Sequence, residues 1–145
     1  MWQTHLISTS PDRKSTLKIL WSYAPGSIKI SLTTPTSERI LYSPDGDRIP
    51  ALHEVAWSSD SHRVAVLVCD LALDKILLGY DLLQAQPLPK GTAAELLEGV
   101  IKRRYQLADQ DLAEAQGDPI TWACSDAGRQ RFSDVAKLLP ELPVP

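Results

Sequence analysis

The sequence predicts an α+β domain in which an antiparallel meander of six or seven strands is followed by helices packed on the sheet. In residues 1–86, short β-type segments alternate with turn signals, whereas residues 92–139 place their apolar side chains at helical spacing. The Pro/Gly-rich stretch 87–91 separates the two parts. A length of 145 residues fits one domain, in which residues 140–145 form an extended tail.

Seven segments of the first part carry strand patterns. In the third, Ile28, Ile30 and Leu32 alternate with polar residues, which is typical of a strand with one buried face. The sixth is nearly all apolar, which predicts a central strand covered on both faces. The predicted strands are Thr4–Thr9, Ser15–Tyr23, Ser27–Thr33, Glu38–Tyr42, His53–Ser58, Arg63–Cys69 and Lys75–Leu82.

The second part predicts three helices. Thr92 and Glu95 have the spacing of a capping box, so the first helix is expected to begin there and to run to about Leu107. A short second helix is expected over 111–117, followed by an extended piece over 119–124. The last helix is expected to start at Ser125 or Asp126 and to bury four apolar residues. These four are Phe132, Val135, Ala136 and Leu139.

Residues 42–82 resemble the repeat of the WD40-like, TolB-type β-propellers. The matching residues are Trp57, Ser58, Asp60, Arg63, the apolar run Val64–Val68 and the strand end Tyr80-Asp81-Leu82, and the stretch 42–49 matches the repeat's turn. The resemblance implies a small bacterial protein and carries no catalytic residues.

The spacing of the turns favours a single sheet over a propeller. The turn residues Asp12, Asp45 and Asp60 are 33 and then 15 positions apart. A propeller would repeat about every 40 to 45 residues over at least four blades. We therefore interpret the propeller-like stretches as tight turns between neighbouring strands of one sheet.

Charge and hydropathy exclude two classes of partner. The net charge is −3 and the densest basic stretch is Lys102–Arg104, so we expect no nucleic-acid binding. No apolar run approaches the roughly 20 residues that cross a bilayer, so we expect no membrane insertion. The N-terminus lacks a signal-peptide pattern, which predicts a cytoplasmic protein, or an extracytoplasmic one if a signal has been removed.

Two cysteines, Cys69 and Cys124, leave two interpretations open. Both can be buried free thiols, which is the interpretation we adopt from composition, since free cysteine is among the most buried residue types. The alternative is one disulfide that joins the strand half to the helical half, which would indicate an oxidising compartment.

One catalytic set can be assembled from the sequence. Cys124 precedes a predicted helix start, where the helix dipole can lower a thiol pKa, and His53 or His62 with Asp60 could supply a base. This would be a small Cys-dependent hydrolase. The histidines lack metal-ligand spacing and no phosphate- or dinucleotide-binding motif occurs, so we predict no metal and no cofactor.

Tryptophans are the remaining candidates for binding. Trp21 and Trp57 occupy apolar strand positions and are predicted to be core residues, whereas Trp2 and Trp122 are candidates for an exposed binding face. The sequence therefore favours a non-catalytic interaction module whose partner is another protein. The alternatives are the hydrolase centred on Cys124 and a bacterial immunity-type inhibitor, and the oligomeric state stays open.

Overall fold

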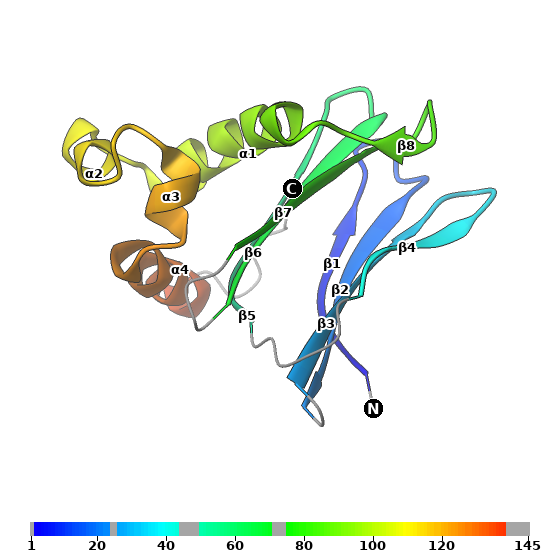
Figure 1. Ribbon diagram of the computed structural model, residues 1–145, viewed down its shortest axis with the longest axis horizontal. Coiled ribbons are helices and arrows are strands. Elements are labelled where there is room, and N and C mark those ends of the chain that lie inside the picture. Colours follow the sequence, from blue (N-terminus) through cyan, green and yellow to red (C-terminus); the bar gives the residue numbers. More distant parts are fainter. Residues whose placement is uncertain (1, 24–25, 44–49, 71–74, 139–145) are drawn as a thin grey trace.

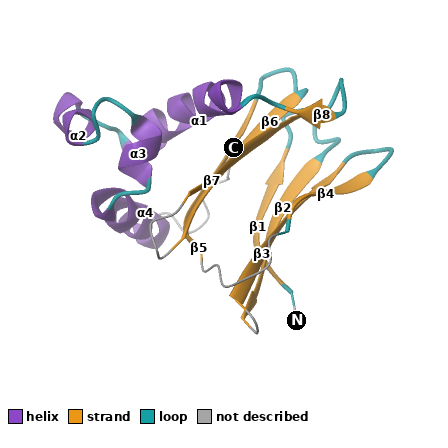
Figure 2. Cartoon of the chain, viewed as in Figure 1, coloured by secondary structure: helices purple, strands orange, loops and turns teal. Residues whose placement is uncertain are grey.

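A computed structural model of the chain describes residues 2–23, 26–43, 50–70 and 75–138, which form an α+β fold as predicted (Figures 1 and 2). The described strands are β1 (Gln3–Thr9), β2 (Thr16–Tyr23), β3 (Gly26–Thr33), β4 (Glu38–Tyr42), β5 (Pro50–Trp57), β6 (Arg63–Asp70), β7 (Lys75–Asp81) and β8 (Gln86–Pro87). The helices are α1 (Lys90–Tyr105), α2 (Asp109–Glu114), α3 (Pro119–Ala123) and α4 (Asp126–Leu138).

The strands form two sheets, so the expectation of one continuous meander is wrong. Each sheet is a four-stranded antiparallel meander, with the order β1-β2-β3-β4 in the first sheet and β5-β6-β7-β8 in the second. The strands divide into two sheets because the second sheet is apolar on both faces and therefore needs a packed layer on each side. Val64, Val66 and Val68 pack toward the first sheet, while Ala65 and Leu67 pack toward the helices. A sheet with two apolar faces needs a layer on each side.

Two buried clusters follow from this three-layer arrangement, which Figure 1 shows from the side. The inter-sheet core joins the facing sides of the two sheets, and its buried members from the first sheet are Leu6, Leu17, Ile19, Ile28, Ile30 and Leu32. The sheet–helix core lies between the second sheet and the helices, and its largest side chain is Trp122. Trp21 and Trp57 pack partly buried against the inter-sheet core, as expected.

The two sheets open with equivalent hairpins. In the β1–β2 turn the Asp12 carboxylate accepts the Ser10 hydroxyl at 2.6 Å, and in the β5–β6 turn Asp60 accepts the Ser58 hydroxyl at 2.6 Å. The residue after each aspartate has a positive φ, 64° in one turn and 65° in the other. The two aspartates are 48 positions apart. The two sheets therefore share their strand number, their strand order and the geometry of their first turn. Asp45 lies outside the described residues.

The outer face of the first sheet is polar where its counterpart in the second sheet is apolar. Counted from the equivalent turns and the strand registers, five apolar positions of β6 and β7 correspond to polar residues of β2 and β3. These positions are Val64, Val66, Ile76, Leu78 and Tyr80, and their counterparts are Thr16, Lys18, Lys29, Ser31 and Thr33. At these five positions the outer face of the first sheet is polar, although the same face also carries the exposed Ile7. The helices cover the second sheet on the other side of the stack.

The helices differ from expectation at two places. Helix α1 begins at Lys90 rather than at Thr92, so the predicted capping box is wrong. The chain enters the helix directly from the sheet, where the Leu88 amide donates to the Gly79 carbonyl at 2.9 Å. Residues 119–123 are helical rather than extended, because the Asp118 carboxylate accepts the Ile120 amide and Pro119 occupies the first turn.

The remaining helix boundaries agree more closely with the sequence pattern. Helix α1 ends at Tyr105, two residues before the expected end, and α2 covers Asp109–Glu114 rather than 111–117. Helix α4 begins at Asp126, and its Phe132 packs against the sheet–helix core. The predicted burial of Val135, Ala136 and Leu139 lies outside the described side chains.

A disulfide joins Cys69 of β6 to Cys124 at the end of α3, with a Cα–Cα distance of 5.4 Å. The interpretation as two free thiols is therefore wrong, and the alternative of a bond between the strand half and the helical half is correct. Cys69 and Cys124 are both buried in the sheet–helix core, one on the sheet side and one on the helix side, and this packing brings the two sulfurs together.

Within the described residues, no helix is both long and apolar enough to cross a membrane.

Candidate binding cleft between the sheets

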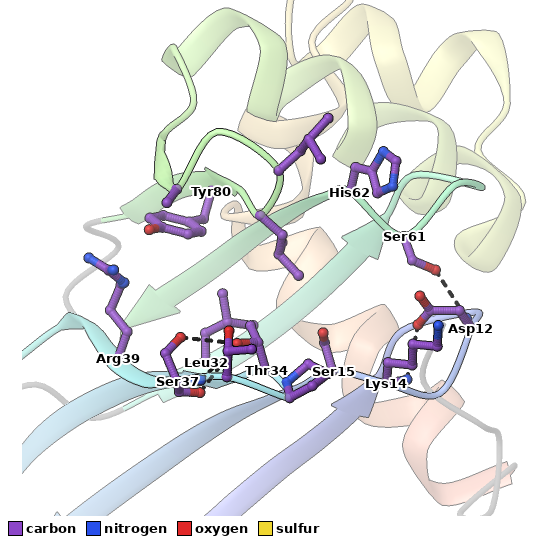
Figure 3. A pocket seen from close by; sticks show the side chains of 15 residues that line it. Asp12, Lys14, Ser15, Leu32, Thr34, Ser37, Arg39, Ser61, His62 and Tyr80 are labelled. Carbon is purple, nitrogen blue, oxygen red and sulfur yellow. Dashed lines mark hydrogen bonds between the residues drawn. The ribbon is translucent and has the colours of Figure 1, made fainter.

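A cleft of about 300 Å³ opens between the two sheets at the end that carries the equivalent turns (Figure 3). Four connections meet there, and we call the space they enclose the inter-sheet cleft. Its lining consists of Asp12, Lys14 and Ser15 from the β1–β2 hairpin; Leu32, Thr34, Pro35, Thr36, Ser37 and Arg39 around the β3–β4 turn; Ser61 and His62 from the β5–β6 turn; and Tyr80, Leu82, Leu83 and Ala85 from the β7–β8 segment.

One end of the inter-sheet cleft is built by the two equivalent turns. The Asp12 amide donates to the Ser61 hydroxyl at 3.0 Å, which ties one turn to the other. The Asp12 carboxylate also accepts the Lys14 amide, so the turn holds the Lys14 backbone in place. Hydrogen bonds from the Ser10 hydroxyl and then from the Lys14 amide lower the pKa of Asp12. The Asp12 carboxylate is therefore used in hydrogen bonds within its own turn.

The other end of the inter-sheet cleft is formed by Arg39 and Tyr80. Arg39 faces inward because it pairs with Leu32 in the β3–β4 register. Its guanidinium carbon lies 5.3 Å from the centre of the Tyr80 ring. Tyr80 is 5% exposed, and its hydroxyl has no hydrogen-bond partner among the described residues. Figure 3 shows the hydroxyl and the guanidinium on the same side of the cleft.

The inter-sheet cleft is positively charged although the chain as a whole is negative. Asp12 supplies the only carboxylate of the described lining, against the cations Lys14 and Arg39. Neither Lys14 nor Arg39 forms a salt bridge with any described residue. His62 is paired with Asp60, with Nδ1 and Oδ2 3.5 Å apart.

The predicted catalytic set is not assembled. His62 and Asp60 meet at the β5–β6 turn, and His62 lines the cleft. Cys124 is bonded to Cys69, which lies at the opposite end of β6 from the turn, seven residues and about 23 Å from His62 along the chain. The hydrolase interpretation needs a free thiolate beside an imidazole. Cys124 has no free thiolate, because its sulfur is bonded to that of Cys69, and the two histidines of the predicted set do not meet it.

His53 lies in an aromatic row at the other edge of the sheets. Its ring centre is 5.1 Å from that of His5 on β1 and 5.3 Å from that of Phe132 on α4. Burial lowers the pKa of His53 to about 4, with smaller contributions from the nearby charges of His5 and Arg104. His53 is thus a neutral packing residue between the first sheet and the last helix.

The two candidate binding tryptophans have opposite surroundings. Trp122 is 1% exposed and packs against Tyr105 at 5.6 Å between ring centres, so the expectation of an exposed residue is wrong. It is buried because residues 119–123 form a helix whose inner face joins the sheet–helix core. Trp2 is 39% exposed on the outer face of the first sheet, where the Lys29 ammonium lies 4.4 Å from its ring centre.

Sequence reasoning missed Lys14, Arg39 and Tyr80 as site residues. Lys14 had a signal, since it follows its turn aspartate by two positions, as His62 does in the equivalent turn. Arg39 and Tyr80 had none, because they belong to different sheets whose face-to-face packing is not visible in strand periodicity.

The comparisons add no relative, since no family model, no curated protein and no solved structure matches the chain. Among the described residues, no group of three or more His, Cys, Asp or Glu is arranged to hold a metal ion. The geometry and chemistry of the inter-sheet cleft are therefore the basis for a functional proposal.

Proposed function

We propose that the protein is a non-catalytic binding module that takes an extended segment of another protein in the inter-sheet cleft. The observation that carries this proposal is the combination, in one open cleft, of apolar side chains with two cations that form no salt bridge with a described residue. Protein sites for ligands combine such apolar walls with a few placed polar groups.

The rim of the inter-sheet cleft supports an extended ligand. β4, which carries Arg39, is an edge strand of the first sheet. Edge strands offer backbone groups to which another chain can add as a further strand. Across the cleft the side chain of Leu83 is 73% exposed, so it is accessible for contact with a partner.

The hydroxyl groups of the lining favour binding over catalysis. Thr34 and Ser37 hydrogen-bond to each other at 3.0 Å, and Ser61 accepts the Asp12 amide. These groups maintain the turns, whereas a nucleophilic hydroxyl is paired with a base. These hydrogen bonds fix the turns that surround the cleft, which supports binding of a segment there.

The same proposal treats the two sheets as two copies of the WD40-like, TolB-type repeat that the sequence resembles. Support comes from the equal number and order of strands and from the equivalent turns at Asp12 and Asp60. In this interpretation the inter-sheet cleft is the space between two neighbouring units.

We also propose that the protein works in an oxidising compartment, on the evidence of the Cys69–Cys124 bond. Structural disulfides persist mainly outside the reducing cytosol. Alkylation of the protein in fractions of its source cell, followed by mass measurement, tests this. Two alkylated cysteines in the native protein would contradict it.

The binding proposal is tested by selecting a random peptide library against the immobilised protein. We expect peptides whose affinity falls about tenfold when Leu83 is replaced by Ala, since a buried aliphatic contact contributes about 1–2 kcal/mol. Ile7→Ala is the matched control, because Ile7 is also an exposed aliphatic residue but lies on the outer face of the first sheet. Failure to recover any binder, or equal losses in both variants, would contradict the proposal.

A further inference from the structure

We infer that the Arg39 end of the inter-sheet cleft is a carboxylate-binding subsite, and that the partner segment places an Asp or Glu side chain there. This inference rests on the proposed binding function and names the chemistry of the ligand at one point. Its basis is the juxtaposition of the Arg39 guanidinium with the unpaired hydroxyl of Tyr80.

The Tyr80 hydroxyl is the first observation. Buried polar groups in native proteins nearly always have hydrogen-bond partners, and those that lack one need an explanation. Tyr80 is 5% exposed and lines the cleft, yet its hydroxyl has no partner among the described residues. The oxygen is buried, so a ligand atom that accepts its hydrogen bond must displace a neighbouring side chain to reach it.

The Arg39 guanidinium is the second observation, and it is independent of the first. It stacks near the Tyr80 ring and forms no salt bridge within the described structure. A guanidinium that stacks on a ring keeps its N–H edges free for an anion. Together, the Arg39 guanidinium and the Tyr80 hydroxyl offer N–H and O–H hydrogen-bond donors to a ligand.

A carboxylate matches this donor set. Its two oxygens can accept from the guanidinium and from the tyrosine hydroxyl at once, in charge-assisted bonds. A single arginine can pair with a carboxylate in this way, and the described lining offers one arginine. The cation at the far end, Lys14, adds attraction for an acidic segment through the same cleft.

The test uses the strongest peptides from the library selection. Each acidic residue of a peptide is replaced by its amide, and each peptide is titrated against the parent protein and Arg39→Gln. We expect one acidic position whose replacement lowers affinity about tenfold on the parent and has little effect on Arg39→Gln, the signature of a direct pair. Lys102→Gln, an exposed cation on α1, is the matched control and should leave affinity unchanged.

Tyr80→Phe tests the hydroxyl separately. It removes one oxygen that has no partner in the described structure, so we expect the variant to fold with at least the parent's stability and yet to lose about threefold to tenfold in affinity. Tyr42→Phe, in the same core but outside the cleft lining, is the control. Retained affinity in both Arg39→Gln and Tyr80→Phe, or peptides without acidic residues, would overturn the subsite while leaving the binding function intact. A library without any binder would instead overturn the binding function.

Discussion

Glu54 is an acidic residue that is fully buried. It is 0% exposed in the sheet–helix core, where its carboxylate lies 3.1 Å from the Arg104 guanidinium and accepts the Tyr105 hydroxyl at 2.5 Å. Burial raises the pKa of Glu54, and the Arg104 charge and the Tyr105 hydrogen bond partly offset this shift. The Glu54 carboxylate therefore depends on the Arg104 charge to remain ionised.

Removal of Arg104 should expose this dependence. Arg104→Ala leaves a buried carboxylate without its cation, and we expect a loss of about 3 kcal/mol in the free energy of unfolding at pH 7. A carboxyl whose folded-state pKa is raised loses stability as the pH rises from its unfolded value, so the loss should be smaller at pH 4.5 than at pH 7. Urea unfolding at both pH values measures this.

Arg103→Ala is the control for that experiment. Arg103 is an exposed neighbour on α1, so its removal should change stability by less than about 0.5 kcal/mol at either pH. Equal losses in the two variants would show that the Glu54–Arg104 contact has no special role.

His53 makes the fold sensitive to acid. Its folded-state pKa of about 4 lies below the ordinary value of 6.5, so the unfolded chain binds the proton more readily. The stability contribution is complete above about pH 6.5 and is lost as the pH falls toward 4, by up to about 3 kcal/mol. The neighbouring His5, whose pKa burial also lowers, adds to this loss.

We expect His53→Leu to unfold with a weaker pH dependence than the parent between pH 7 and pH 4.5. His62→Leu changes an exposed turn residue and should keep the parent's dependence. Thermal unfolding across this range measures both. A parental pH dependence in His53→Leu would contradict the assignment.

At the level of elements, α4 approaches the backbone of α3 closely at Gly128. A Cβ on Gly128 would lie 2.3 Å from the Trp122 carbonyl oxygen and 2.5 Å from that of Ala123. The Gly128 amide donates to the hydroxyl of Ser125, the residue that precedes α4. The absence of a side chain at Gly128 is therefore what allows α4 to follow α3 directly.

Gly128→Ala should cost about 1–3 kcal/mol because backbone atoms must move to admit the methyl group. Gly99→Ala is the matched control, since Gly99 is also helical but a Cβ there meets nothing within 4 Å. The control should gain up to about 1 kcal/mol from higher helix propensity. Differential scanning calorimetry distinguishes the two, and similar effects would contradict the packing argument.

The elements also show where sequence patterns were sufficient. Seven strands were predicted within a few residues, because alternation with a period of two is set by each strand's own burial. The helix Pro119–Ala123 was missed although its Asp118 cap and its proline are visible in sequence. Five residues are too few for a helical period to be recognised.

At the level of the whole molecule, the disulfide joins parts that are 55 residues apart in sequence. In the chain-entropy treatment a loop of that length contributes about 4 kcal/mol by restricting the unfolded state. We expect the Cys69→Ala/Cys124→Ala double variant to unfold at lower temperature by a corresponding amount. The parent treated with reductant in denaturant should match it, and unchanged stability in both would contradict this role.

The outer face of the first sheet carries the exposed Ile7, but lysines interrupt it, and we expect these charges to keep the protein monomeric. Lys18 and Lys29 occupy the positions equivalent to Val66 and Ile76, which in the second sheet are buried against another sheet. We expect Lys18→Val/Lys29→Ile to associate at micromolar concentration, as exposed apolar sheet faces do. Light scattering after size exclusion measures this, with Lys90→Val/Lys102→Ile on α1 as control. A monomeric double variant would contradict the argument.

Local patterns were enough to predict the class of fold, the strands and most of the helical part, since these depend on the burial and turn preferences of neighbouring residues. They also limited the disulfide question to one pair. Only the tertiary structure decided that the strands divide into two stacked sheets, that Cys69 meets Cys124, and that Arg39 approaches Tyr80 across a cleft. Each of these joins residues from separate elements, and such contacts depend on how whole faces pack rather than on any short stretch of chain.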